Sequence, residues 1–228
     1  MGMWFAKLHE TFIETGYYHL ILEGFRNTII ISLGACLIGI VIGTVIAVIR
    51  YFAEENRVLV PLAHLCEAYV TVIRGIPVVV LLLVFYYIIM KSSEGILVGI
   101  MTFGINSGAY MAELIRGGIN AVDFGQTEAG RSLGMSRIAT MRYIVFPQAL
   151  KHILPAIGNE LIALIKETSV AGYVAVVDLT RAGNLVRNNT YDAVNPLMIV
   201  AVIYLLLVIF LTKILGIAER RMSVSGKR

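Results

Sequence analysis

Long apolar runs separated by short polar stretches follow one another along the whole chain. Uncharged runs cover residues 27–49, 75–90, 95–112 and 193–212. A helix needs about 20 predominantly apolar residues to cross a bilayer, and these runs approach or reach that length. The pattern therefore predicts a multi-spanning, all-α membrane protein.

We expect five transmembrane helices. The second apolar region has no polar loop, but Arg74, Gly75 and Pro77 interrupt it, so one long bent helix is favoured over two crossings. A loop of about twenty residues is expected before the last helix. The predicted spans are about 22–49, 58–90, 95–118, 149–171 and 195–215.

The flanking segments complete the predicted domain organisation. Residues 1–20 mix apolar, aromatic and charged positions, which is typical of an amphipathic interfacial segment. Residues 21–217 form the transmembrane domain, which includes a polar segment at 123–147, and residues 218–228 form a basic tail. Cys36 and Cys66 lie in apolar stretches without metal-ligand spacing and are interpreted as packing residues.

Composition and charge agree with this architecture. Apolar residues make up 58% of the 228 residues and charged residues 15%, with a mean hydropathy of +0.81, which excludes most soluble domains. The net charge of +4 is spread between the apolar runs instead of lying on one surface. We therefore interpret it as a topology signal and expect contact with membrane lipid and none with nucleic acid.

The basic residues favour an amino terminus outside and a carboxyl terminus inside, because segments on the cytoplasmic side carry an excess of Lys and Arg. With that orientation, twelve basic residues lie inside and five outside. The inner ones are Arg50, Arg57, Arg116, Arg131, Arg137, Arg142, Lys151, Lys213, Arg220, Arg221, Lys227 and Arg228, and the outer ones are Lys7, Lys91, Lys166, Arg181 and Arg187.

The polar segment at 123–147 carries the strongest motif. Gly134 permits the positive-φ turn that ends one short helix, Ser136 can cap the next, and Pro147 is expected to stop that helix before the fourth span. The segment therefore predicts a rigid helix-turn-helix, which we call the knob, able to dock into a groove on a soluble partner. The alternative is an interfacial helix on anionic lipid. The motif residues are Glu128, Ala129, Gly130, Gly134, Ile144 and Pro147.

This motif resembles the EAA loop of ABC importer permeases, in which EAA is followed by three residues, Gly, nine residues and I-x-L-P. Two positions depart from it, Gly130 for Ala and Phe146 for Leu. Other stretches resemble the polar amino acid branch of that superfamily, which includes histidine, glutamine and arginine permeases. They are Arg74-Gly75-Ile76-Pro77, Ser107 to Glu113 with Arg116-Gly117-Gly118, Pro147-Gln148-Ala149-Leu150, Gly158-Asn159-Glu160 and Lys166-Glu167-Thr168-Ser169.

The resemblance implies a type I ABC importer permease of the bacterial inner membrane. Its partners would be an identical second permease chain, two copies of an ATPase subunit and an extracytoplasmic amino-acid-binding protein. The chain lacks the G-x-x-x-x-G-K-[ST] phosphate loop, so it is expected to be a transport subunit without enzymatic activity or a cofactor of its own. ATP and magnesium would be bound by the partner ATPase.

Polar residues within the predicted spans repeat at helical spacing, so each of three helices presents one polar stripe. Ionisable groups in a span usually face a cavity or a partner, which predicts a water-accessible substrate path near mid-bilayer. The alternative is mutual salt bridging that only fixes helix packing. The stripe residues are Glu67, Arg74, Asn106, Tyr110, Glu113, Glu160, Lys166 and Glu167.

The stripes hold four acidic and two basic residues, which favours a cationic amino acid, arginine, lysine or histidine, as cargo. The predicted function is therefore a permease subunit that imports polar amino acids by alternating access. The competing hypothesis is an ion channel or proton-coupled carrier that uses the intramembrane acids as its relay.

The predicted topology can be tested by labelling single cysteines introduced at Ser92 and Ser136 in a chain that lacks Cys36 and Cys66. We expect a membrane-impermeant thiol reagent to label the first site in intact cells, and the second only after the membrane is opened. Labelling of Ser136→Cys in intact cells would contradict the orientation.

Overall fold

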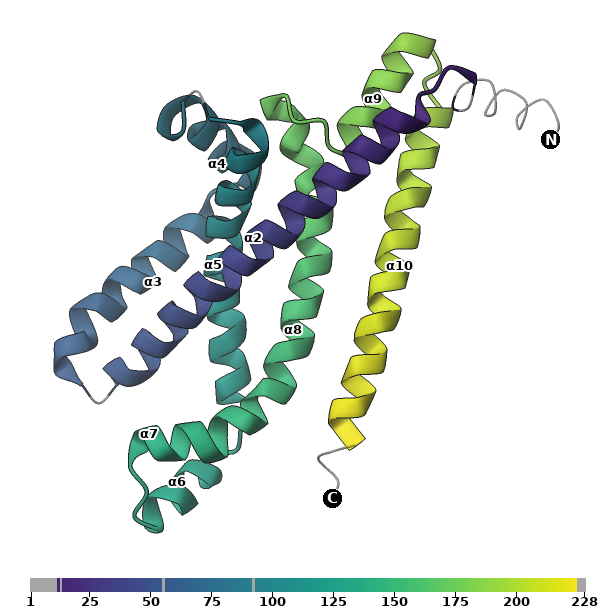
Figure 1. Ribbon diagram of the computed structural model, residues 1–228. Helices are drawn as coiled ribbons and strands as arrows, with labels where there is room; N and C mark the ends of the chain where they lie inside the picture. The colour runs from purple at the N-terminus through teal and green to yellow at the C-terminus, as the bar shows by residue number, and fades with distance from the viewer. Residues whose placement is uncertain (1–11, 13, 55, 92, 225–228) are drawn as a thin grey trace. The chain divides into compact units, whose positions relative to one another are not determined.

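The structure is a computed structural model that describes residues 12, 14–54, 56–91 and 93–224. Helices form nearly all of these residues, and no strand occurs among them. Backbone groups in lipid must be satisfied within the protein, which a helix achieves without a partner. The predicted all-α class is confirmed. The longest helices are α2 (Tyr18–Ala53), α5 (Gly95–Asn120), α8 (Phe146–Glu167) and α10 (Asn195–Val224) (Figure 1).

Four helical stretches in the described part of the chain are long and apolar enough to cross a membrane. They are Tyr18–Ala53, Arg57–Gly75, Gly95–Asn120 and Asn195–Arg220. The helix α8 has 22 residues, enough for a crossing, but its composition is more polar, with Glu160 and Lys166 in its second half. The number of five spans therefore stays a prediction.

The long bent helix predicted over 58–90 is wrong, because the chain is broken at Pro77. A short 3-10 turn, η2 (Arg57–Leu59), leads into α3 (Val60–Gly75), and α4 (Val78–Val84) begins after the break and ends in a π turn, η3 (Phe85–Ile89). Pro77 has φ −57° and ψ 134°, which is extended rather than helical. Proline also disfavours the helical conformation of the residue before it, so the helix ends instead of bending.

The chain forms two compact units, and each is assembled from separate stretches of sequence. The first unit comprises Met1–Cys36, Ile76–Gly104 and Ala163–Phe210, and the second comprises Leu37–Gly75, Ile105–Ile162 and Leu211–Arg228. The boundary between Gly75 and Ile76 coincides with the break before Pro77.

In the first unit, a helix occupies the segment that was predicted as a twenty-residue loop. After α8, the 3-10 turn η5 (Thr168–Val174) leads to α9 (Leu179–Thr190). The buried Asp178 caps α9 and accepts hydrogen bonds from the backbone N–H groups of Thr180, at 2.9 Å, and Arg181, at 3.3 Å. Burial raises the pKa of the Asp178 carboxyl to about 6. The loop prediction is wrong because Asp178 caps a helix whose apolar residues, such as Leu179 and Val186, are buried.

The start of α9 is fastened to the first half of α2. Asn27 donates its side-chain amide to the carbonyl of Val177 at 2.9 Å, and the N–H of Leu179 donates to the hydroxyl of Thr28 at 3.1 Å. Because these polar groups satisfy one another, the segment can be buried there without loss of hydrogen bonds.

In the second unit, α2 and α5 approach so closely that glycine is required at the contact. A Cβ atom at Gly39 would lie 2.7 Å from the hydroxyl oxygen of Ser107, and one at Gly43 would lie 2.7 Å from the backbone nitrogen of Ala112. These glycines therefore pack within one subunit. Cys66 is buried against the same helix pair, which confirms its interpretation as a packing residue, and Cys36 is buried as well.

The knob consists of α6 (Phe124–Ser132) and α7 (Arg137–Thr140), and a π turn, η4 (Met141–Val145), connects α7 to α8 without a break. The prediction that Pro147 stops the helix is wrong. Pro147 is the second residue of α8, and proline is tolerated in the first turn of a helix. The predicted fourth span, 149–171, corresponds to 146–167 in the structure.

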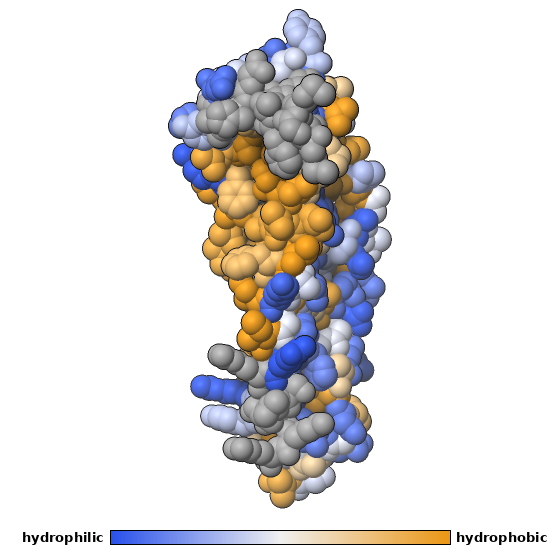
Figure 2. All heavy atoms as spheres, turned by 90° about the vertical axis from the view of Figure 1, so that its right-hand side faces the viewer, coloured by the Kyte–Doolittle hydropathy of each residue, from blue (hydrophilic) through white to orange (hydrophobic). Residues whose placement is uncertain are grey.

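The last helix, α10, exposes apolar side chains over most of its length. Figure 2 shows hydrophobic side chains gathered over this face, as expected for contact with lipid or another subunit. The helix continues to Val224, so the predicted tail begins as helix, and residues 225–228 lie outside the described part. Of the predicted interfacial segment 1–20, residues 1–11 and 13 also lie outside it.

The glycine contact between α2 and α5 predicts a specific cost for a single methyl group. We expect Gly43→Ala to destabilise the protein by about 1–3 kcal/mol, since the backbone of Ala112 cannot move aside. Gly117→Ala on α5 is the matched control, because no atom lies within 4 Å of its added Cβ and the change should be neutral or slightly stabilising. Thermal denaturation of the two purified variants in detergent measures the difference, and equal melting temperatures would contradict the packing.

Candidate functional site

The knob has the geometry that the motif predicts. Gly134 adopts φ +79°, a left-handed conformation that reverses the chain after α6, and the N–H of Met135 bonds back to the carbonyl of Gly130 at 3.2 Å. The hydroxyl of Ser136 then caps α7 by accepting from the N–H of Ala139 at 3.2 Å. The predicted turn and cap are both confirmed.

Gly130, one of the two departures from the family pattern, is required by the packing of the knob. A Cβ atom there would lie 2.8 Å from Cγ2 of Thr140 and 2.9 Å from Cδ1 of Ile144. The backbone of α6 thus rests directly on the segment after the turn, and α6, α7 and η4 form one body.

The outer surface of the knob is unusually apolar for a polar segment. Glu128 and Ala129 are exposed, and so are five large apolar side chains between residues 124 and 146. Several large apolar groups exposed on one short segment are typical of a protein-binding surface. The exposed apolar residues are Phe124, Leu133, Ile138, Tyr143 and Phe146.

Residues of the predicted polar stripes bond with other side chains at two places in the second unit. At the first, which we call the Glu160 cluster, Ser107 on α5 donates to Oε1 of Glu160 on α8 at 3.0 Å. The guanidinium of Arg74, at the end of α3, lies 4.9 Å from the ring centre of Tyr110 on α5. Asn106 is buried next to Ser107. Three helices therefore contribute polar groups, as the stripes predict.

The second place, the Glu113 cluster, joins one carboxylate to two guanidinium groups. Arg50 on α2 bonds Oε1 of Glu113 at 2.5 Å, and Arg116, one turn along α5, bonds Oε2 at 2.5 Å and 3.1 Å. Each carboxylate oxygen is satisfied by a different arginine. This pairing supports the alternative reading for Glu113, in which salt bridges fix helix packing.

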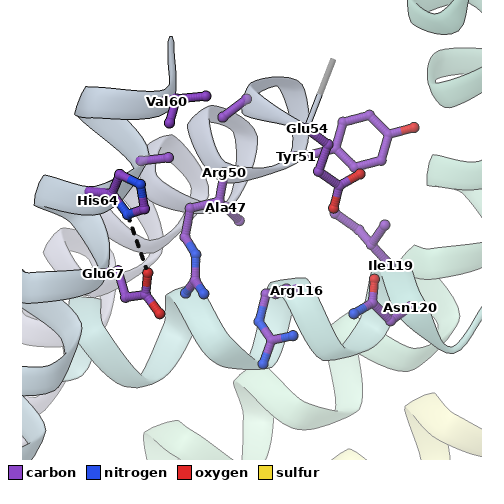
Figure 3. Close-up of a pocket in the computed structure, with 12 residues that line it drawn as sticks. Ala47, Arg50, Tyr51, Glu54, Val60, His64, Glu67, Arg116, Ile119 and Asn120 are labelled. Carbon is purple, nitrogen blue, oxygen red and sulfur yellow. Dashed lines mark ion pairs between the residues drawn. The ribbon is translucent and has the colours of Figure 1, made fainter. Parts of the chain in front are cut away.

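Beside the Glu113 cluster lies a cavity of about 350 Å³ at the ends of α2, α3 and α5 (Figure 3). Arg50 and Arg116 approach it from α2 and α5, and His64 and Glu67 from α3, with Nδ1 of His64 at 3.8 Å from Oε2 of Glu67. The cavity therefore has charges of both signs on its walls and small apolar residues, such as Ala47, between them.

Other predicted site residues are arranged differently. Glu67 is mainly exposed and pairs with His64, whereas the guanidinium of Arg74 lies over the ring of Tyr110. Lys166 and Glu167 belong to the first unit, where Lys166 lines a cavity together with Thr180 and Tyr204.

Three residues that form contacts in these sites were not predicted as site residues from the sequence. Arg50 was assigned to a loop, and only the extension of α2 to Ala53 places it opposite Glu113. Ser107 belongs to a stretch that resembles the family, but neither Ser107 nor Arg137 carries a local signal for its contact. Their partners are more than 50 residues away, Glu160 for Ser107 and Tyr51 for Arg137.

Comparison with known proteins places these features in a family. The model for the binding-protein-dependent transport system inner membrane component matches residues 39–224. The putative glutamine transport system permease protein GlnP of Rickettsia prowazekii is 37% identical over 209 residues, covering 90% of this chain and 94% of that protein. The glutamine transport system permease protein GlnP of Escherichia coli K12 is 35% identical over 210 residues, with the same coverage.

Chains of solved ABC transporters are also similar to this chain. A chain from the crystal structure of an amino acid ABC transporter with histidines is 37% identical, with a TM-score of 0.84 over 91% of this chain and 96% of that one. A chain of the inward-facing MetNI methionine ABC transporter is 22% identical, with a TM-score of 0.75 over 90% and 97%, and therefore shows the fold alone.

The left-handed turn of the knob predicts which residues position 134 can accept. The strain comes from backbone conformation, because nothing lies within 4 Å of an added Cβ. We expect Gly134→Val to abolish coupling between ATP hydrolysis and uptake while membrane insertion stays intact, since β-branched residues avoid positive φ. Gly134→Asn should keep most of the coupling, because Asn tolerates this conformation. Equal uptake per ATP in the Val variant and the unmodified protein would contradict the role of the turn.

Proposed function

Since the chain belongs to the family of binding-protein-dependent transport system inner membrane components, we propose that it forms the translocation path of an ATP-driven importer of polar amino acids and acts by alternating access. It is a transport subunit, and ATP is hydrolysed by a separate subunit. The complex that we propose contains two copies of this chain, two ATPase subunits and an extracytoplasmic amino-acid-binding protein.

The exposed apolar surface of the rigid knob carries this proposal. A body of two packed helices with Phe124, Leu133 and Ile138 in the solvent needs a partner surface to bury them. The groove of an ATPase subunit is such a surface, and closure of the ATPase pair would move the knobs. The two states of the path would then differ in their affinity for the cargo.

The proposed cargo follows from the charges of the second unit. The charged stripe residues of this unit are three acidic ones, Glu67, Glu113 and Glu160, and one basic, Arg74. Arg50 and Arg116 bring the basic residues to three, so the acidic excess that favoured a cationic cargo disappears. A balanced path suits an amino acid whose side chain is polar and uncharged, the class to which the glutamine of the permease relatives belongs. The predicted cationic cargo, arginine, lysine or histidine, is the other outcome that the transport test distinguishes.

Within the Glu160 cluster, we propose that Arg74 contacts the carboxylate of the cargo and Glu160 its ammonium group. Arg74 lies over Tyr110, and Glu160 accepts from Ser107, which is one turn before Tyr110 on α5, so the two residues offer opposite charges to a zwitterion. The competing proton relay is disfavoured for Glu113, because a carboxylate held by two guanidinium groups is poorly placed to exchange protons.

The cargo is identified by uptake into proteoliposomes that contain this chain with its ATPase and binding-protein partners. We expect ATP-dependent uptake of labelled glutamine, weaker competition by arginine and histidine, and none by glutamate. Glu160→Gln should reduce affinity for the cargo by about tenfold to a hundredfold, the loss of a charge-assisted hydrogen bond. Ser107→Ala is the matched control, since it removes the hydrogen bond to Glu160 but no charge, and its effect should be several times smaller.

Three results would change the proposal. Uptake without ATP, driven by an ion gradient, would favour the carrier hypothesis. Preferential uptake of arginine, with a loss confined to cationic cargo in Glu160→Gln, would restore the cationic prediction. Equal losses in Glu160→Gln and Ser107→Ala would assign Glu160 to helix packing.

A further inference from the structure

The side chain of Arg137, the first residue of α7, reaches the end of α2. Its Nη2 atom lies 2.8 Å from the carbonyl oxygen of Tyr51 and 3.0 Å from Oε2 of Glu54. The guanidinium carbon also lies 4.3 Å from the ring centre of Tyr51 and 5.9 Å from that of Phe52. Only 13% of the side chain is exposed, so this cation sits between the knob and α2.

The contacts with Tyr51 contribute most to holding Arg137 at the end of α2. Glu54 is 72% exposed, and an ion pair with such an exposed partner contributes little. The carbonyl of Tyr51, in contrast, is one of the last four of α2, which have no partner within the helix. A cation at this end also interacts favourably with the helix dipole, and a planar guanidinium can donate to the carbonyl while it lies over the ring.

Arg137 moves with the entire knob. Because Gly130 packs directly on Thr140 and Ile144, α6 and α7 cannot shift independently. The knob is joined to α8 through the continuous backbone of η4, and it is joined to α2 through Arg137. The residue before Tyr51 is Arg50, whose guanidinium bonds Glu113 beside the cavity of Figure 3.

We propose that Arg137 is a positioning residue that links the knob to α2, so that a displacement of the knob moves Arg50 and the cavity wall as well as α8. This inference rests on the proposed function, in which the ATPase subunits move the knob. Arg137 contacts no cargo in this scheme, and it acts through the end of α2.

The first experiment measures the link in the permease alone. Hydrogen exchange of the backbone amides at residues 50–54 should become at least about threefold faster in Arg137→Ala, because the last turn of α2 loses its partner. Arg137→Lys should give an intermediate rate, since Lys keeps the charge but not the planar donor. Arg57→Ala is the matched control, because it removes an exposed arginine from the same end of the second unit, and it should leave the exchange unchanged.

The second experiment measures coupling in the complete complex with labelled glutamine, or with the amino acid that the uptake screen selects. We expect Arg137→Ala to reduce uptake per ATP hydrolysed by about tenfold, as for the loss of one charged hydrogen bond, with ATP hydrolysis retained. Tyr51→Leu should reduce the same ratio, whereas Tyr51→Phe, which keeps the ring and the carbonyl, should not. Uptake per ATP in Arg137→Lys should lie between those of the Ala variant and the unmodified protein.

The outcomes separate this inference from the function on which it rests. If the unmodified complex shows no ATP-dependent uptake, the proposed function fails, and hydrogen exchange still decides whether Arg137 holds α2. If uptake is coupled normally in Arg137→Ala, or if exchange at residues 50–54 is unchanged, the link is refuted. Loss of complex assembly in both Arg137→Ala and Tyr51→Leu would also overturn it, since the contact would then be needed only for folding.

Discussion

The close contact between the backbones of α2 and α5 is the constraint on which the second unit depends. Helices in lipid gain no hydrophobic force by meeting one another, so they associate through close packing and polar bonds. Because Gly43 packs against the backbone of Ala112, the axes of α2 and α5 lie close together over this stretch. Arg50 lies seven residues after Gly43 on the same face of α2, so the packing brings its guanidinium to Glu113.

The double pairing of Glu113 is a second consequence of that contact. A carboxylate near a membrane is costly unless it is paired, and here each of its oxygens has its own arginine. Because Arg116 comes from α5 itself, Glu113 keeps one partner even when α2 shifts. The cavity wall can therefore change shape without leaving an isolated carboxylate, which suits the alternating access that we propose.

Much of the fold and part of the site could be predicted from the sequence, for physical reasons. Hydrophobic length identifies α2, α5 and α10, and the conformational demands at Gly134 and Ser136 identify the knob, because these signals are local. The predictions for the two prolines were wrong in opposite ways. The helix expected to continue past Pro77 ends there, and the helix expected to end at Pro147 continues. The same residue type ends one helix and is accepted in the first turn of another, and the surrounding turns decide which.

The remaining site features depend on partners distant in sequence. The pairing of Arg50 with Glu113, of Ser107 with Glu160 and of Arg137 with Tyr51 each follows from helix packing that no local pattern contains. The requirement for glycine at position 130 is similar, since only the approach of Thr140 and Ile144 explains it. Sequence periodicity places polar groups on a face, and packing decides which of them meet.

The π turn between α7 and α8 has a consequence for the direction in which the knob points. A π turn holds one residue more than the corresponding stretch of α-helix, and each residue of a regular helix rotates the chain by about 100°. The five residues Met141–Val145 therefore set the angular phase of everything before them relative to α8. A chain shortened by one residue here could form an unbroken α-helix, yet its knob would face a different side of the axis.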